Sequence, residues 1–298
     1  MRRHFTLAAI AQAVAKPAPV EVIRVPSYTE GPVFDYEGNF YFSHGRYVTR
    51  LAPSGAAERW LEADGPNGHK VLPDGVHLVC EAKRGVVLRV SAAGSILGNA
   101  SAECEGKPLR APNDLTLDER GGFYFTDPGG SREAPVGTIH YVDRGGVTHL
   151  AAGGLRVPNG LVLRPGGELL LVAETVPNRI LEFRVLAPGR LGLARVFAEL
   201  PGRPGSGAEP DGMALDEDGN LYVAHLGMSA VQVLDSTGRL FRTLAAGNYD
   251  ASNVVFGGAL RDQLYVTGSF GHRSNTGGRV YRIDLPGVRG VSVLLPRG

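Results

Sequence analysis

Short apolar stretches alternate with glycine-containing turns along almost the whole chain. The segment 30–44 shows the unit, which is an apolar strand, a Glu-Gly-Asn turn and an aromatic-rich strand. The same layout recurs at 67–81, 113–127 and 211–225, and in looser copies with longer turns at 159–174 and 252–268. The pattern therefore predicts six repeats of one strand hairpin.

A second pair of apolar stretches follows each hairpin. Examples stand at 86–90, 139–142, 180–184, 231–235 and 280–284. The repeats begin at 30, 67, 113, 159, 211 and 252, so the steps are 37, 46, 46, 52 and 41 residues. Four strands per repeat at this spacing are typical of propellers. The sequence predicts an all-β fold, a six-bladed β-propeller with four antiparallel strands per blade.

The N-terminal region sets the domain boundaries. An apolar stretch at 21–25 precedes the first repeat, and we expect it to complete the last blade, because an unpaired sheet edge there would be a liability. Residues 20–298 are then one propeller domain behind an extension at 1–19. Two arginines precede an apolar run at 5–15, which fits either a short helix or a secretory signal. We favour the helix and a cytoplasmic protein; a working signal would make the protein periplasmic or secreted.

Composition excludes several classes of function. The formal charge is +1 and no basic run carries interleaved aromatics, which argues against nucleic acid as a partner. No apolar run reaches the ~20 residues that span a bilayer, so no membrane association is expected. Two cysteines exclude a disulfide scaffold. We expect a monomer or weak homodimer that acts on a small molecule.

Polar residues recur at two phases of the repeat. The first strand of a propeller blade lines the central channel, and the second strand returns beside it. The residues that open the repeats all carry a side-chain oxygen, and we call them the inner ring: Glu30, Asn67, Asn113, Asn159, Asp211 and Ser252. Ionisable residues end five of the second strands, and we call them the outer ring: His44, Glu81, Asp127, Glu174 and His225. Both rings should lie at one mouth of the channel.

Turn formation is the alternative explanation for the inner ring. Pro-Asn-Gly and Pro-Asp-Gly are ordinary turn sequences, and Pro73-Asp74-Gly75 is expected to be only a hairpin turn. Glu30, however, is a poor turn former, and the polar choice recurs at one phase. We therefore favour a site. Oxygen donors without sulfur favour a hard cation, and Ca²⁺ accepts six to eight oxygens in loose geometry. Mg²⁺, Mn²⁺ and Zn²⁺ are the alternatives.

Four segments carry a family resemblance. They are Tyr-Thr-Glu-Gly-Pro at 28–32, Pro-Asn-Asp-Leu-Thr-Leu-Asp at 112–118, Val-Pro-Asn-Gly-Leu at 157–161, and the stretch 209–224, which begins Glu-Pro-Asp-Gly. From about residue 20 onward the chain resembles the gluconolactonase/regucalcin-like family (senescence marker protein) of calcium-dependent propeller hydrolases, which includes diisopropyl fluorophosphatase. The resemblance implies that Glu30, Asn113, Asn159 and Asp211 hold the metal, and that Asn113 also contacts substrate.

The implied reaction is hydrolysis of a lactone or similar ester. Asp211 is the first candidate for the base or nucleophile, with His225 and Asp127 as alternates. The remaining ring residues are expected near the substrate: Asn67, Ser252, His44, Glu81 and Glu174. Three alternatives stay open, namely phosphotriester hydrolysis at the same metal, a non-enzymatic binding propeller, and a calcium ion that only stabilises the ring.

Overall fold

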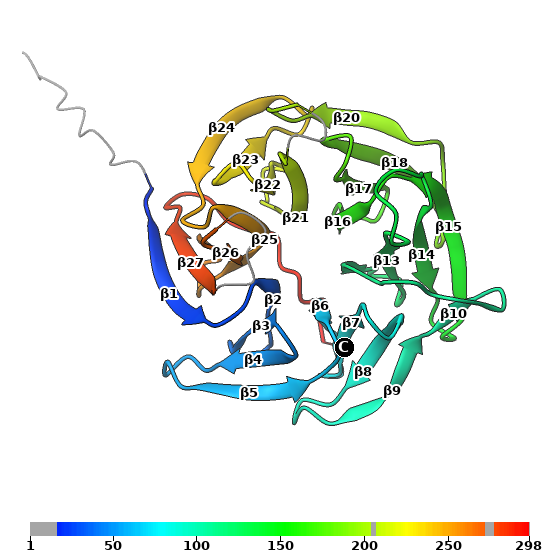
Figure 1. The fold of residues 1–298 in the computed structure, drawn as a ribbon, viewed down its shortest axis with the longest axis horizontal. Coiled ribbons are helices and arrows are strands. Elements are labelled where there is room, and N and C mark those ends of the chain that lie inside the picture. The colour runs from blue at the N-terminus through cyan, green and yellow to red at the C-terminus, as the bar shows by residue number, and fades with distance from the viewer. Residues whose placement is uncertain (1–16, 204–206, 272–276, 298) are drawn as a thin grey trace, which may run out of the picture.

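Six antiparallel sheets surround one central axis in the computed structural model, which describes residues 17–203, 207–271 and 277–297 (Figure 1). The described residues contain strands and no helix. The predicted six-bladed β-propeller is therefore confirmed. The helix or signal expected at the N-terminus falls on residues 1–16, outside the described residues. Within the described residues, no helix is long and apolar enough to cross a membrane.

Each blade takes its strands in chain order from the axis outward, except for the outermost strand of blade six. Blade one holds β2 (Thr29–Phe34), β3 (Phe40–His44), β4 (Tyr47–Leu51) and β5 (Ala57–Glu62). Blade two holds β6 (Pro66–Val71), β7 (His77–Glu81), β8 (Val86–Val90) and β9 (Ile96–Ser101). Blade three holds β12 (Leu115–Leu117), β13 (Phe123–Asp127), β14 (Gly137–Val142) and β15 (Thr148–Leu155).

The other three blades follow the same order, and blade four carries one extra strand. Blade four holds β16 (Pro158–Leu163), β17 (Leu169–Glu174), β18 (Arg179–Ala187), β19 (Arg190–Leu191) and β20 (Arg195–Glu199). Blade five holds β21 (Glu209–Leu215), β22 (Leu221–Leu226), β23 (Ala230–Leu234) and β24 (Leu240–Ala245). Blade six holds β25 (Asp250–Gly257), β26 (Gln263–Ser269) and β27 (Gly278–Asp284).

The N-terminal strand closes the ring. β1 (Pro19–Val25) pairs antiparallel with β27 as the fourth strand of blade six, so the first and last strands of the propeller share one sheet. The expected closing strand is thereby confirmed. Two additions were not predicted: a small hairpin of β10 (Glu103–Cys104) and β11 (Lys107–Pro108) before blade three, and the β18–β19 hairpin in blade four.

Aspartates fix the turn between the first two strands in several blades. In blade one, Asp35 Oδ1 accepts hydrogen bonds from the backbone N–H of Glu37 and of Asn39, at 3.0 and 2.8 Å, and its Oδ2 accepts one from the Tyr41 hydroxyl at 3.0 Å. Asp216 makes the matching bonds to Asn220 and Tyr222 in blade five. An Asp side chain that binds the backbone two residues on is the usual device for such a turn.

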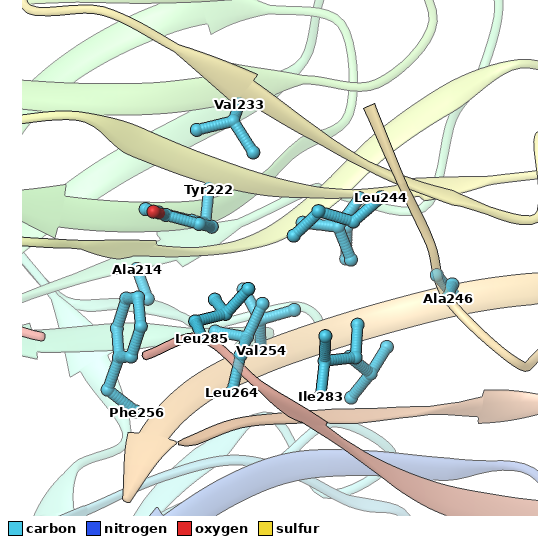
Figure 2. Close-up of a cluster of buried hydrophobic side chains, with 14 residues drawn as sticks. Ala214, Tyr222, Val233, Leu244, Ala246, Val254, Phe256, Leu264, Ile283 and Leu285 are labelled. Carbon is cyan, nitrogen blue, oxygen red and sulfur yellow. The ribbon is translucent and has the colours of Figure 1, made fainter. Parts of the chain in front are cut away.

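Apolar side chains pack between neighbouring blades. Figure 2 shows the cluster between blades five and six, where the rings of Tyr222 and Phe256 meet edge to face at 4.9 Å and Leu264 and Ile283 are fully buried. Comparable clusters fill the other contacts between blades. The core is therefore a ring of apolar clusters between the blades, and the first strands line the axis.

The C-terminal segment closes one end of the channel. It crosses the middle of the ring (Figure 1), where the Val291 N–H donates to the Leu215 carbonyl at 2.8 Å and the Tyr36 hydroxyl donates to the Leu295 carbonyl at 2.7 Å. Between this segment and the first strands lies a mainly apolar cavity of about 120 Å³. We call this the far end, and the opposite end, where the first strands begin, the mouth.

Candidate metal and catalytic site

Five of the six first strands bend where their inner-ring residue stands. The pairing register shifts at that point in β2, β6, β16, β21 and β25, and such a bulge re-aims a side chain. The following glycine is needed for close approach. A Cβ at Gly31 would lie 1.9 Å from the Asn67 carbonyl oxygen, and one at Gly160 would lie 2.3 Å from the Asp211 carbonyl oxygen. The Glu-Gly, Asn-Gly and Asp-Gly pairs therefore reflect crowding at the axis.

Several inner-ring oxygens have no protein partner. Asp211 is buried, and its Oδ1 has no hydrogen-bond partner. The Asn67 Oδ1 is likewise buried and unpaired. Among the described residues, the half-buried side-chain amides of Asn113 and Asn159 have no partner either. Because buried polar atoms are nearly always hydrogen-bonded, this cluster of free oxygens points to a missing ligand.

Carboxylates crowd together at the same place. Burial, together with the nearby Asp114 carboxylate, raises the pKa of Glu30 to about 7. Burial raises the pKa of Asp211 well above its usual value, and the charges of Glu30 and Asp114 add to the shift. These carboxyl groups repel one another when ionised, and a bound cation would relieve that repulsion.

Tyr28 is a further polar group at the mouth that the residue patterns did not single out. Its hydroxyl donates to Asp211 Oδ2 over 3.4 Å. Burial raises the pKa of this phenol well above its usual value, and the charges of Asp211 and Glu30 add to the shift. Tyr28 therefore stays protonated and can only donate to Asp211.

Three residues below the inner ring were also missed by sequence reasoning, and we call Lys70, Asp114 and Asn253 the floor. The Asn253 Nδ2 donates to Glu30 Oε2 at 3.1 Å and to Asp114 Oδ2 at 3.4 Å. The Lys70 Nζ lies 3.8 Å from Asp114 Oδ1. A signal did exist, because four inner-ring residues are followed by glycine, whereas Asn113 and Ser252 are followed by Asp114 and Asn253.

The outer-ring carboxylates stand beside the inner ring but bind loops. Glu81 Oε1 accepts from the Asp64 N–H at 2.6 Å, and Glu174 Oε1 accepts from the Arg156 N–H at 2.8 Å. Asp127 accepts from three backbone N–H groups, those of Arg110, Ala111 and Gly129. Each of these carboxylates thus holds the loop that enters the first strand of its own blade. These contacts give them a positioning role.

The outer-ring histidines and Ser252 are also engaged. His44 Nε2 lies 2.8 Å from Thr49 Oγ1. His225 is fully buried between Asn178 and Gln232, and burial lowers its pKa to about 4. The Ser252 hydroxyl is fully buried and donates to the Thr29 carbonyl at 2.7 Å. The structure brings none of these three into the group of unpaired oxygens, so direct contact with substrate stays a prediction for them.

The oxygen donors at the mouth fit a hard divalent cation. Glu30, whose Oε2 accepts from the Gly31 N–H at 2.6 Å, and Asp211 could supply carboxylate oxygens, and Asn113 and Asn159 could supply amide oxygens, which are the donors that Ca²⁺ prefers. Within the described residues, no three His, Cys, Asp or Glu side chains are placed to share one ion. An ion at this mouth would therefore depend on the amides as well as the carboxylates, as the inner-ring argument predicts.

Known proteins resemble this chain in sequence and in fold. Diisopropyl-fluorophosphatase of Loligo vulgaris is 27% identical over 239 residues, which cover 70% of this chain and 75% of the relative. Gluconolactonase of Zymomonas mobilis is 29% identical over 239 residues, covering 69% and 67%. The fold matches a calcium-binding protein, regucalcin, of Agrobacterium tumefaciens with a TM-score of 0.80 and 22% identity, over 95% of this chain and 99% of that one.

The family match spans most of the propeller. The SMP-30/Gluconolactonase/LRE-like region matches residues 28–270, a range that runs from Tyr28 at the mouth to the end of β26 and includes every inner-ring residue. The chain therefore belongs to the SMP-30/gluconolactonase/LRE-like family.

Proposed function

We propose that this protein is a calcium-dependent hydrolase that opens a lactone at the mouth of its channel. The observation that carries the proposal is the pair of buried, unpaired oxygens, Asp211 Oδ1 and Asn67 Oδ1, at the mouth where the Glu30 and Asp211 carboxylates repel each other. Relatives with hydrolase names, a gluconolactonase and a diisopropyl-fluorophosphatase, support the reaction class. The calcium-binding name of the regucalcin structure supports the choice of ion.

Glu30, Asn113, Asn159 and Asp211 would hold the ion in this proposal. When bound, a divalent cation polarises a carbonyl or phosphoryl oxygen and stabilises developing negative charge. Asp211 is the proposed base or nucleophile, because its Oδ1 is unpaired while its Oδ2 accepts from Tyr28. Asn67, whose amide oxygen is also unpaired, would receive a hydroxyl group of the substrate.

His225 and Asp127 are weaker candidates for the base. His225 is enclosed, with both ring nitrogens bonded, and both oxygens of Asp127 already accept backbone N–H groups. A general base must come within hydrogen-bond reach of the proton that it removes. Asp211 meets this condition with the smallest rearrangement.

Hydrolysis assays on chelator-treated protein test the proposal. Activity on a panel of sugar and aliphatic lactones should vanish with chelator, return with Ca²⁺, and fall on the order of 10²–10³-fold in Asp211→Asn. The matched control is Asp235→Asn, which changes a partly buried carboxylate of a turn in blade five and should leave the activity intact. Turnover that persists in Asp211→Asn would contradict the assignment.

Phosphotriester hydrolysis at the same site is the second candidate. The 27% identity to diisopropyl-fluorophosphatase favours it, and an unpaired carboxylate beside a cation suits attack at phosphorus as well as at carbon. The same protein samples should be assayed with a fluorophosphate. A higher kcat/KM there than on every lactone would reverse the order of the two candidates. Calcium binding without turnover on either class would indicate a binding propeller or a structural ion.

A further inference from the structure

The floor joins opposite sides of the channel. Asp114 belongs to blade three and Asn253 to blade six, and in a ring of six blades these two face each other across the axis. Their side chains meet there, with Asn253 Nδ2 3.4 Å from Asp114 Oδ2. Glycines make room for both of them. A Cβ at Gly68 would lie 2.6 Å from Asp114 Oδ1, and one at Gly212 would lie 1.9 Å from Asn253 Cγ.

The floor also separates two different environments. Above it stand the carboxylates and amides of the inner ring. Below it lies the mainly apolar cavity of about 120 Å³, which Lys70 lines together with Met213, Leu215 and Val254. The Lys70 ammonium donates to the His69 carbonyl at 3.1 Å and lies 3.8 Å from Asp114 Oδ1. Lys70 thus brings a positive charge to the underside of the site.

The formal charges of the two proposed carboxylate ligands and the floor would balance one divalent cation. As carboxylates Glu30, Asp211 and Asp114 carry a formal −3, and Lys70, which lies beside Asp114, carries +1, so the formal total is −2. Glu209 also acts on Asp211, but it is bound to Arg132 at 2.5 Å, and that pair adds no net charge. A protein tunes its affinity for a cation through the number of charges at the site.

We propose that Lys70, Asp114 and Asn253 form a fixed floor that sets the net charge of the site and so selects a divalent cation over a trivalent one. The inference rests on the metal site of the proposed function. Asn253 holds the Glu30 carboxylate in place, and the Lys70–Asp114 pair adjusts the charge from outside the ion's own ligands. Such supporting partners typically change metal affinity about 10–100-fold.

Competition between Ca²⁺ and Tb³⁺ tests the charge assignment without any substrate. Terbium luminescence and calcium calorimetry on the full chain give the ratio of the two affinities. Lys70→Met should raise the preference for Tb³⁺ about tenfold, because the site loses a positive charge, and Asp114→Asn should lower it by a similar factor. The double variant, which restores −2, should return to within about threefold of the wild-type ratio.

Two further variants guard against a purely structural effect. Lys70→Arg keeps the positive charge of the floor and should keep the ratio of the two affinities. Lys83→Met removes an exposed lysine outside the floor, which pairs with Asp64 at the mouth, and should also keep that ratio. Equal ratios in wild type, Lys70→Met and Asp114→Asn would overturn the inference even if Ca²⁺ binds. If Lys70→Met does not fold, the opposite shift in Asp114→Asn decides alone. A wild-type protein that binds no divalent cation would overturn both the inference and the proposed function.

Discussion

The two ends of the channel are built from the same six first strands, yet they differ in what they leave unsatisfied. At the mouth, Asp211 Oδ1 and Asn67 Oδ1 are buried without a partner, and burial with mutual repulsion raises the pKa of Glu30 to about 7. At the far end, Val291 and Leu295 pack on the strands, and their backbone groups pair with Leu215 and Tyr36.

This difference separates a region shaped by stability from one shaped by function. Unpaired buried oxygens and crowded carboxylates destabilise a fold, and such conflicts are expected where a ligand binds. The far end differs, because its segment buries apolar side chains and the backbone groups of Val291 and Leu295 are paired; no pair of crowded carboxylates stands among the described residues that line its cavity. Substitutions at the two ends should therefore move activity and stability in different directions.

The largest expected effect is at Glu30. Glu30→Gln should lower hydrolysis on the order of 10²–10³-fold, since a charged donor is lost. The same change should raise the melting temperature of the metal-free protein, because it removes a buried charge that Asp114 repels. Assays with Ca²⁺ and thermal unfolding with chelator measure the two effects. If metal-free Glu30→Gln melts at a lower temperature than wild type, the carboxylates at the mouth do not destabilise the fold, and the contrast with the far end is lost.

Buried histidines at both ends should make the protein acid-sensitive. Burial lowers the pKa of His225, near the mouth, and of His77, near the far end, from 6.5 to about 4. Between pH 6.5 and 4 each of these histidines binds more protons in the unfolded state than in the folded state, so its contribution to the free energy of unfolding falls as pH falls, whereas the raised pKa of Glu30 acts in the opposite direction. Each histidine changes the free energy of unfolding by up to about 3 kcal/mol over this pH range.

Chemical denaturation between pH 7.5 and 4.5 measures how far the free energy of unfolding falls as the pH is lowered. His225→Gln should reduce this fall in the free energy of unfolding, because Asn178 and Gln232 can still form hydrogen bonds with an uncharged amide. His149→Gln is the matched control, since His149 is exposed and pairs only with Asp143 among the described residues. If both variants leave the pH dependence of the free energy of unfolding unchanged, His225 does not contribute to the acid sensitivity.

The smallest expected effect is at the far end. Leu295→Ala should lower the free energy of unfolding by about 1–2 kcal/mol, because the side chain is only partly buried against the cluster that contains Leu117. Calcium affinity should stay within about twofold of wild type, since the floor separates this segment from the mouth. Denaturant melts and calorimetry measure both quantities. A large loss of calcium affinity would show that the two ends are coupled.

Sequence patterns predicted the fold because its repeats are local. The strand hairpin of blade one recurs in five further copies, and the spacing alone indicates a propeller. The closing strand followed from the cost of an open sheet edge. The hairpins β10–β11 and β18–β19 were not predicted, because they fall in the longer connections, for which the repeat pattern gives no information.

The placement of the candidate residues at the mouth followed from the sequence for the same reason. Glu30, Asn113, Asn159 and Asp211 share one phase, so symmetry alone places them at the mouth. The floor was missed because Lys70 lies outside that phase, and because Asp114 and Asn253 stand where other repeats have glycine. The roles of Glu81 and Glu174 depend on loop backbones that no repeat specifies.

Calcium binding to the chelator-treated wild-type protein is the decisive measurement for a metal site at the mouth. Calorimetry should show one calcium ion bound per chain, with the affinity lost in Glu30→Gln and kept in Asp235→Asn. Thermal unfolding should then show a higher melting temperature with Ca²⁺, equivalent to about 2.7 kcal/mol when free Ca²⁺ is about a hundredfold above Kd. A protein that binds no Ca²⁺, Mg²⁺, Mn²⁺ or Zn²⁺, and melts at the same temperature with and without them, would contradict the account.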